Sequence, residues 1–222
     1  MINAIILLSG GIDSVTALYW ALNKGYHPLG LTFDGFDELD TTHHYIKKIV
    51  HKTGIMHLTI PIPYIKYAEA LKKEGISLLN AEKYPSDYVP AKNLIYFSIA
   101  SYYAAVYNTE IIIKGLIKSD FDKFPDNSYE YFRKLESIIN ISIGFDNVFS
   151  PKIEFPLKEY NKPEVIQLAL ELEVPLELTW SCYEEEYKDG PCGKCKGCIE
   201  RISAFKSLSI EDPYLMKRKN IM

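Results

Sequence analysis

Five short apolar runs are spaced along the chain and are separated by longer segments with helical periodicity. Apolar runs of this length are typical of strands that are covered on both faces of a sheet. Their alternation with helices predicts an α/β fold with a parallel sheet and helices on both faces. The predicted strands comprise residues 4–8, 29–33, 56–60, 110–114 and 152–155.

Three segments between these runs have clear helical signals. One follows the first strand, begins near Asp13 and ends near Gly25. A second begins after Asn161, a good N-cap, with Lys162 and Pro163 in its first turn. Residues 93–107 are apolar almost all round and contain three alanines, so they predict a buried helix whose tyrosines belong to the core.

The turn after the first strand reads Ser9-Gly10-Gly11-Ile12-Asp13-Ser14. Two glycines allow backbone amides to converge on an anion, and the following helix N-terminus adds a partial positive charge. The chain has no Gly-x4-Gly-Lys-Ser/Thr run and no Gly-x-Gly-x-x-Gly in this turn, which disfavours two other nucleotide motifs. An ordinary turn is the alternative. The Ser-Gly-Gly turn lies at the carboxyl end of a strand, and this place favours a phosphate site over an ordinary turn.

All four cysteines of the chain lie near its C-terminal end, within residues 182–198. Four thiolates suit Zn²⁺ and close its coordination sphere, so we expect one structural zinc ion per chain. An iron–sulfur cluster and a pair of disulfides are the alternatives. We see no redox motif that would favour the cluster and no secretory signal that would favour the disulfides. The predicted ligands are Cys182, Cys192, Cys195 and Cys198.

Composition is that of a compact enzyme that we expect to be cytoplasmic. Its 222 residues are 47% hydrophobic, and no apolar stretch reaches the ~18 residues of a membrane span. The net charge of -4 argues against direct, charge-driven binding to nucleic acid. Three histidines at 43, 44 and 51 lack the partners of a recognisable second metal site.

The Ser-Gly-Gly turn resembles the pyrophosphate loop of the PP-loop ATPases, which adenylate a substrate and release pyrophosphate. Further matches narrow this resemblance to one subfamily. They are Leu-Thr-Trp-Ser-Cys-Tyr at residues 178–183, the three later cysteines, and Arg201 with Ala204 and Phe205. Together they are similar to the 7-cyano-7-deazaguanine synthase family, from residue 4 to about residue 205. The resemblance implies a Rossmann-like fold of the adenine nucleotide alpha hydrolase type, with a nucleotide-binding domain at 1–178 and a helical zinc-binding subdomain at 179–222.

The resemblance also implies the residues of the site. Without it, Lys162 is one surface lysine among many, and residues 119–128 form a solvated polar loop over the site. With it, the first strand end and its turn bind ATP, three residues act in catalysis, and a second group contacts the substrate. The implied ATP-binding residues are Leu8, Ser9, Gly10, Gly11, Ile12, Asp13, Ser14 and Gly115; the catalytic residues are Asp13, Ser14 and Lys162; the substrate-binding residues are Lys92, Asn93, Asp120, Phe124 and Asp126.

The activity implied by the resemblance is ATP-dependent conversion of 7-carboxy-7-deazaguanine and ammonia into 7-cyano-7-deazaguanine. Carboxylates are poor electrophiles, so adenylation supplies a leaving group, and Mg²⁺ accompanies ATP. The resulting amide is then activated by a second ATP and loses oxygen to give the nitrile. The family resemblance further implies a homodimer and a place in queuosine or archaeosine biosynthesis.

Three loops depart from the family pattern. Residues 35–39 are acidic where the family has a Tyr-Gly-Gln-Arg-His sequence. Ala91-Lys92 replaces Gly-Arg, and Asn127-Ser128 replaces Cys-Arg, so each of these two loops also lacks the arginine of the family pattern. A different acceptor, or a nucleotide sensor that is stabilised by zinc and has no catalytic activity, therefore remains an alternative.

Overall fold

The computed structural model describes residues 1–35, 40–62, 88–121, 123–143, 149–183 and 190–215. Five parallel strands form one sheet in the order β3-β2-β1-β4-β5. Each strand agrees with its predicted range to within one residue at either end, which confirms the parallel α/β fold. The strands are β1 (Ala4–Leu7), β2 (Pro28–Asp34), β3 (Met56–Pro61), β4 (Ile111–Lys114) and β5 (Lys152–Glu154).

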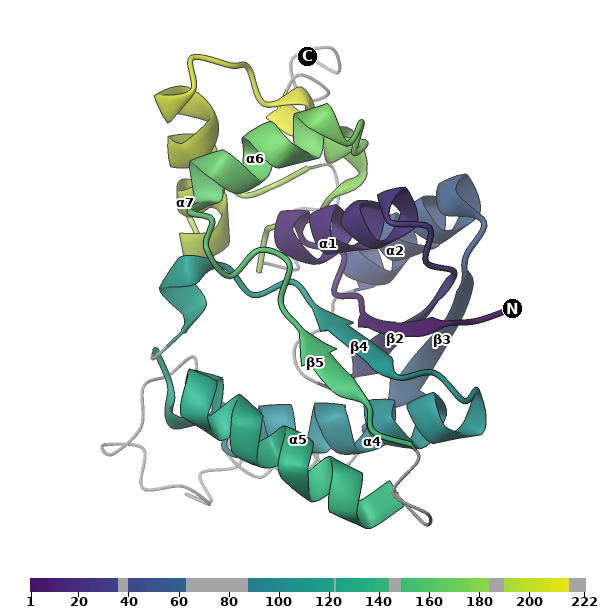
Figure 1. The fold of residues 1–222 in the computed structure, drawn as a ribbon. Helices are drawn as coiled ribbons and strands as arrows, with labels where there is room; N and C mark the ends of the chain where they lie inside the picture. The colour runs from purple at the N-terminus through teal and green to yellow at the C-terminus, as the bar shows by residue number, and fades with distance from the viewer. Residues whose placement is uncertain (36–39, 63–87, 122, 144–148, 184–189, 216–222) are drawn as a thin grey trace, which may run out of the picture.

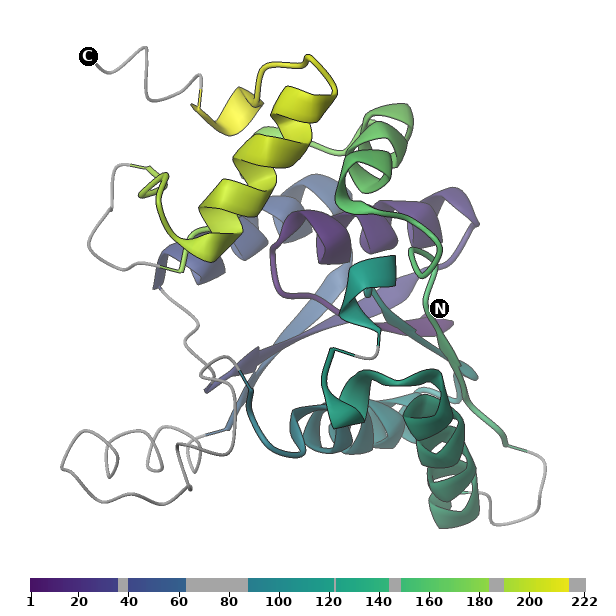
Figure 2. The same ribbon diagram turned by 90° about the vertical axis from the view of Figure 1, so that its left-hand side faces the viewer.

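Helices cover both faces of the sheet, as Figures 1 and 2 show. On one face lie α1 (Ile12–Asn23), α2 (Asp40–Thr53) and α6 (Lys162–Glu171), and on the other lie α4 (Lys92–Val106) and α5 (Tyr129–Ile143). The last long helix, α7 (Lys196–Ser207), packs beside α6. Within the described residues, no helix has both the length and the apolar character needed to cross a membrane.

The central strand β1 is buried on both faces because its side chains alternate between two apolar clusters. Ile6 and Leu8 pack with α1, α2 and α6, while Ile5 and Leu7 pack with α4 and α5. Burying one aliphatic side chain of this size contributes roughly 1.5–3 kcal/mol. This two-sided burial explains why the strand is a continuous apolar run.

The structure corrects the prediction that residues 93–107 form a buried helix. One face of α4 packs on the sheet through Phe97, Ala100 and Ala104, which are fully buried. The opposite face is solvent-exposed, and the side chains of Tyr102 and Val106 are 62% and 57% exposed. The prediction is wrong because α4 lies in an outer layer, which buries only one side of a helix.

The C-terminal part of the chain packs on the sheet domain in two ways. Phe205 of α7 is fully buried in the same cluster as α1 and α6. A second, smaller cluster joins Trp180, Cys182, Cys198 and Tyr214. The division into units 1–178 and 179–222 remains a prediction.

Candidate functional site

The predicted phosphate loop connects β1 to α1 and turns sharply at a glycine. Gly10 has φ +77°, a conformation that L side chains rarely adopt, and an added Cβ would lie 2.8 Å from Cγ1 of Ile46. Gly11 is the N-cap of α1 and contributes no side-chain cap. The first N–H groups of a helix have no partner within the helix, so this end of α1 presents donors to an anion.

The hydroxyl of Ser14 holds this loop together. Its Oγ donates to the carbonyl of Gly11 at 3.1 Å. It accepts hydrogen bonds from the backbone N–H of Ser9 at 3.2 Å and from the Ser9 hydroxyl at 3.0 Å. The loop is thus closed by its own side chains before any ligand binds, which lowers the entropic cost of binding.

A lysine and an aspartate far apart in the sequence meet beside the loop. Lys162, at the start of α6, places its Nζ 2.5 Å from Oδ2 of Asp13 in the first turn of α1. The second carboxylate oxygen of Asp13 is buried and has no hydrogen-bond partner among the described residues. Burial raises the pKa of Asp13, Lys162 lowers it, and Asp120 and Glu200 raise it further, with a net upward shift.

A capping box fixes the position of Lys162. Oδ1 of Asn161 accepts from the backbone N–H of Glu164 at 3.0 Å, and Oε2 of Glu164 accepts from the N–H of Asn161 at 2.7 Å. The N–H groups of Asn161 and Glu164 are therefore both satisfied, and Lys162 projects from a defined helix end. The predicted N-cap is confirmed.

Gly115 lets the segment after β4 pass close to the phosphate loop. A Cβ on Gly115 would lie 2.6 Å from the carbonyl oxygen of Asp13 and 3.0 Å from Cα of Ser14. These are backbone atoms that cannot move aside cheaply, so only glycine fits. The loops after β1 and β4 thus meet where the strand order reverses, which is where open parallel sheets bind ligands.

The predicted substrate residues include a buried polar cluster between α4 and the turn Pro125–Asn127. The side-chain amide of Asn93 donates to the carbonyl of Asp126 at 2.6 Å and to Oδ1 of Asn127 at 2.7 Å. Its backbone N–H donates to Oδ2 of Asp126 at 3.2 Å. Because these groups bond to one another, Asn93 and Asp126 position this wall of the site.

Lys114 completes the cluster, and the sequence reasoning missed it. This last residue of β4 donates from Nζ to Oδ1 of Asn93, and its Nζ lies 5.7 Å from the centre of the Phe97 ring. Burial lowers its pKa, the neighbouring Lys92 lowers it further, and the opposing pull of Asp126 and Asp120 leaves the pKa at about 7. The signal in the sequence was a charged residue at the carboxyl end of an apolar strand, directly before a glycine.

The remaining predicted substrate residues lie on neighbouring turns. Asp120 accepts from the backbone N–H of Ile117 at 3.0 Å. Phe124 packs against Tyr88 with ring centres 5.2 Å apart. Lys92 sits at the start of α4, with Nζ 5.6 Å from the centre of the Tyr96 ring.

Two of the three divergent loops take structural roles. Oδ1 of Asn127 accepts from Asn93, and Oγ of Ser128 accepts from the N–H of Tyr131 at 3.1 Å in the first turn of α5. Ala91 has φ +58° at the N-cap of α4, where the family pattern has glycine. Of the third loop, residues 36–39 lie outside the described residues.

The four cysteines converge as predicted. Their sulfur atoms all lie within 4.8 Å of one another. A tetrahedral zinc site with Zn–S bonds of ~2.3 Å places its sulfurs about 3.8 Å apart. The donor set and spacing therefore fit Zn²⁺ after a small contraction, and Cys182, Cys192, Cys195 and Cys198 would be its ligands.

Backbone amides around Cys192 favour the thiolate form of this residue, which is the form that binds metal. The N–H of Cys195 donates to Sγ of Cys192 at 3.2 Å, and the N–H of Lys194 donates to the same sulfur at 3.4 Å. Although burial acts to raise the pKa of Cys192, these donors bring it down to about 7. Cys195 is also the N-cap of α7, whose dipole favours negative charge.

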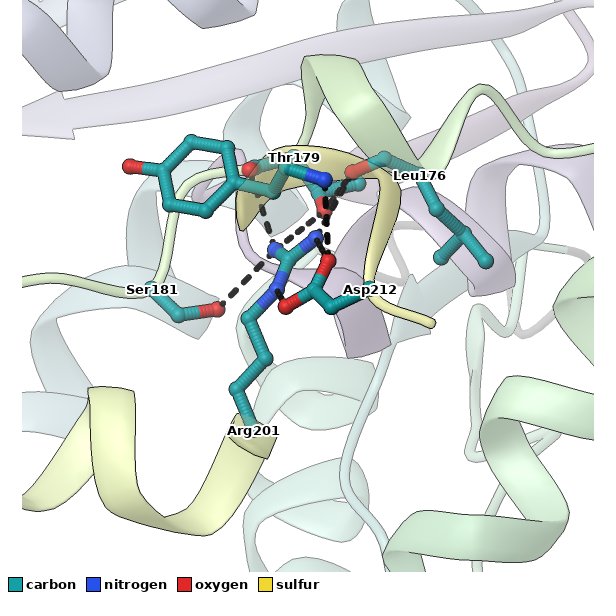
Figure 3. Close-up of polar contacts among 6 residues, drawn as sticks. Leu176, Thr179, Ser181, Arg201 and Asp212 are labelled. Atoms are coloured by element: carbon teal, nitrogen blue, oxygen red, sulfur yellow. Dashed lines mark hydrogen bonds and ion pairs between the residues drawn. The ribbon is translucent and has the colours of Figure 1, made fainter. Parts of the chain in front are cut away.

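A buried ion pair fastens the segment before the cysteines (Figure 3). Nε and Nη2 of Arg201 donate to the two carboxylate oxygens of Asp212 at 2.7 and 2.9 Å. The same guanidinium donates to Oγ1 and the carbonyl of Thr179 at 2.8 and 3.1 Å and to the carbonyl of Leu176 at 2.9 Å. The charge is thus fully engaged, as burial requires.

This segment reaches the phosphate loop through Trp180. The backbone N–H of Trp180 donates to the carbonyl of Gly10 at 2.8 Å. Its indole N–H donates to the carbonyl of Cys182 at 2.8 Å, and its ring stacks on Tyr45 of α2 with centres 5.0 Å apart. The cysteine site is therefore connected to the loop through Trp180, a connection that the sequence did not predict.

Solved structures share this fold at low sequence identity. NMN synthetase from Francisella tularensis aligns with a TM-score of 0.53 at 18% identity, covering 99% of this chain and 82% of that one. A predicted subunit of tRNA methyltransferase from Methanocaldococcus jannaschii aligns with a TM-score of 0.52 at 20% identity, covering 77% of each chain. At this identity the likeness establishes the fold alone.

Sequence comparison identifies the family. A 7-cyano-7-deazaguanine synthase from Thermoplasma volcanium is 33% identical over 95% of this chain and 89% of its own length. One from Campylobacter jejuni is 34% identical over 95% of this chain and 96% of its own length. The family profile described as Queuosine biosynthesis protein QueC matches residues 3–209. The chain therefore belongs to the QueC family, which confirms the family predicted from its phosphate loop and cysteines.

Proposed function

We propose that this protein is an ATP-dependent ligase that converts 7-carboxy-7-deazaguanine and ammonia into 7-cyano-7-deazaguanine. Family membership supports the reaction, since the relatives carry the name of this synthase. One observation carries the proposal. The phosphate loop, Lys162 and the Asn93–Asp126 cluster all lie near the point where the strand order of the sheet reverses. This arrangement can hold a nucleotide and an acceptor at one edge of the sheet.

The phosphate loop and the start of α1 would hold the phosphates of ATP. Backbone N–H groups at the helix N-terminus favour anions, and Gly10 and Gly11 leave them accessible. Lys162 would shift from Asp13 towards the departing pyrophosphate and stabilise its charge. Orientation and charge stabilisation are the contributions expected of a site with no covalent intermediate.

Mg²⁺ would bind with ATP on the carboxylate side of this loop. The buried Oδ1 of Asp13, which has no hydrogen-bond partner among the described residues, is an oxygen donor of the kind that Mg²⁺ prefers. When bound, the ion neutralises charge on the phosphates. Asp13 would orient it, while the cysteine site, closed by four sulfurs, would hold a zinc ion with a structural role.

A homodimer is part of the proposal. Leu94, Ser98, Tyr102 and Val106 are spaced by four residues on the outer face of α4, and three of the four are large, exposed apolar side chains. An exposed apolar stripe of this kind is suited to a subunit interface. Light scattering of the purified protein at several concentrations would measure its mass in solution.

The test is mass spectrometry of the products formed from Mg-ATP, ammonium and 7-carboxy-7-deazaguanine by protein with its zinc content measured. The nitrile, AMP and pyrophosphate are the expected products. Lys162→Met should abolish AMP formation, whereas Lys158→Met, an exposed lysine four residues earlier, should not. Return of the unchanged acid without AMP would refute the proposed acceptor, and a panel of other carboxylates would then separate a different acceptor from a nucleotide sensor.

A further inference from the structure

Lys114 stands at a position that the fold alone would fill with an apolar residue. The other residues of β4 are isoleucines, and Ile112 and Ile113 are fully buried. Lys114 follows them, is itself half-buried, and precedes Gly115, which touches the phosphate loop. Burial of a lysine disfavours its charged form and so costs free energy. A lysine at such a position therefore suggests a functional role.

Among the described residues, the groups around Lys114 compensate its charge only in part. Asn93, which accepts its hydrogen bond, is neutral, and Lys92 adds a second cation nearby. Two acidic groups act on Lys114. Asp126, in the turn Pro125–Asn127, also accepts from the backbone N–H of Asn93, and Asp120 accepts from the N–H of Ile117. Burial and Lys92 outweigh these carboxylates, so the pKa of Lys114 falls to about 7.

Lys114 belongs to the polar cluster between α4 and the turn Pro125–Asn127. The hydrogen bond from Lys114 to Asn93 places its ammonium in the same buried cluster that joins Asp126 and Asn127.

We propose that Lys114 recognises the carboxylate of the acceptor and so determines the preference of this enzyme for an anionic over a neutral acceptor. The inference rests on the proposed function, and adds to it a residue with a defined task. Lys114 donates to Asn93 and would form a charge-assisted hydrogen bond to the substrate carboxylate in the complex. The substrate carboxylate would add a negative charge beside Lys114, in addition to those of Asp126 and Asp120.

Proton uptake should accompany this binding. Burial and Lys92 hold the pKa of Lys114 at about 7, and an adjacent substrate carboxylate would raise it. Binding of the acid at pH 8 then takes up a proton, and its affinity falls as the pH rises above 7. The amide that follows the first activation has no carboxylate, so its affinity should lack this dependence.

Isothermal titration calorimetry with the zinc-loaded protein would test the inference, using 7-carboxy-7-deazaguanine and its carboxamide as ligands. Lys114→Met should weaken binding of the acid by roughly 10- to 100-fold, as expected for loss of a hydrogen bond to a charged group, and leave the amide within about twofold. Lys114→Arg should retain part of the preference because it keeps the charge. Lys118→Met is the matched control, since Lys118 is exposed on the turn after β4.

Titration in buffers of different ionisation enthalpy adds a readout that a structural role would not change. Wild type should take up a proton with the acid, and Lys114→Met should take up none. If wild type binds and adenylates the acid but Lys114→Met keeps its affinity and proton uptake, the inference is wrong and the proposed function stands. If wild type binds neither acid nor amide, the proposed function fails and the inference falls with it.

Discussion

Asp212→Asn should be among the most destabilising single-atom exchanges in this protein. Asp212 and Arg201 have side chains that are only 2% and 3% exposed, and two hydrogen bonds of 2.7 and 2.9 Å join them. The variant keeps the shape of the side chain but leaves the guanidinium buried without a counter-ion. It also turns an NH₂ group toward the donors of Arg201, if the oxygen continues to accept from the N–H of Tyr214 at 3.0 Å.

The size of the effect follows from burial. Removing one partner of a buried ion pair typically costs about 3–5 kcal/mol, because the other charge stays out of water without compensation. In a chain of this size 1 kcal/mol corresponds to roughly 2–4 °C in Tm, so we expect a decrease of roughly 6–20 °C. Removing both charges together, as in Arg201→Met with Asp212→Leu, should cost less than removing one.

The assay is equilibrium unfolding in urea and by heat, with the zinc content of each variant matched. Glu130→Gln is the control, because Glu130 and Lys134 lie at the same 2.7 Å distance but are 68% and 65% exposed. Solvent screens that pair, so its loss should leave the midpoint nearly unchanged. Equal midpoints for Asp212→Asn and Glu130→Gln would refute the reasoning, since burial would then not decide the value of the pair.

Three further predictions address the site. Gly115→Ala should cost about 1–3 kcal/mol and abolish ATP use, because its Cβ would overlap the Asp13 carbonyl at 2.6 Å. Gly54→Ala, which is strained by its φ of +69° but has open space around the added Cβ, should keep ATP use, as measured by AMP release. Zinc removal by a chelator should weaken ATP binding, measured by titration calorimetry, since Trp180 connects the cysteine site to Gly10; unchanged affinity in zinc-free protein would contradict this connection. Burial lowers the pKa of Lys114 from 10.5 to about 7, so between these pH values the folded protein binds fewer protons than the unfolded protein, and its stability rises with pH. Relative to Lys114→Met, the free energy of unfolding of the wild type should increase by at most about 1.4 kcal/mol per pH unit from pH 7 to 9. Urea unfolding that gives the same pH dependence for both proteins would rule out the pKa shift.

The strands and the first helix were predictable because local pattern and environment agree. Residues 4–8 are apolar without interruption, and β1 lies at the centre of the sheet, where both faces are covered. Asn161 predicted the start of α6 because an N-cap acts within one turn. The burial of the helix at 93–107 was predicted wrongly, because an apolar composition does not show that α4 packs against the protein on one side only.

Within the site, the sequence by itself determined the chemistry and the tertiary structure decided its arrangement. The Ser-Gly-Gly loop and the four closely spaced cysteines could be predicted because glycine conformation, helix dipoles and thiolate ligation depend on local residues. The pair of Lys162 with Asp13, the contact of Trp180 with Gly10 and the position of Lys114 could not, because they join segments far apart in the chain. Burial also sets the pKa of Lys114 and the value of the Arg201–Asp212 pair, and burial exists only once the chain has folded.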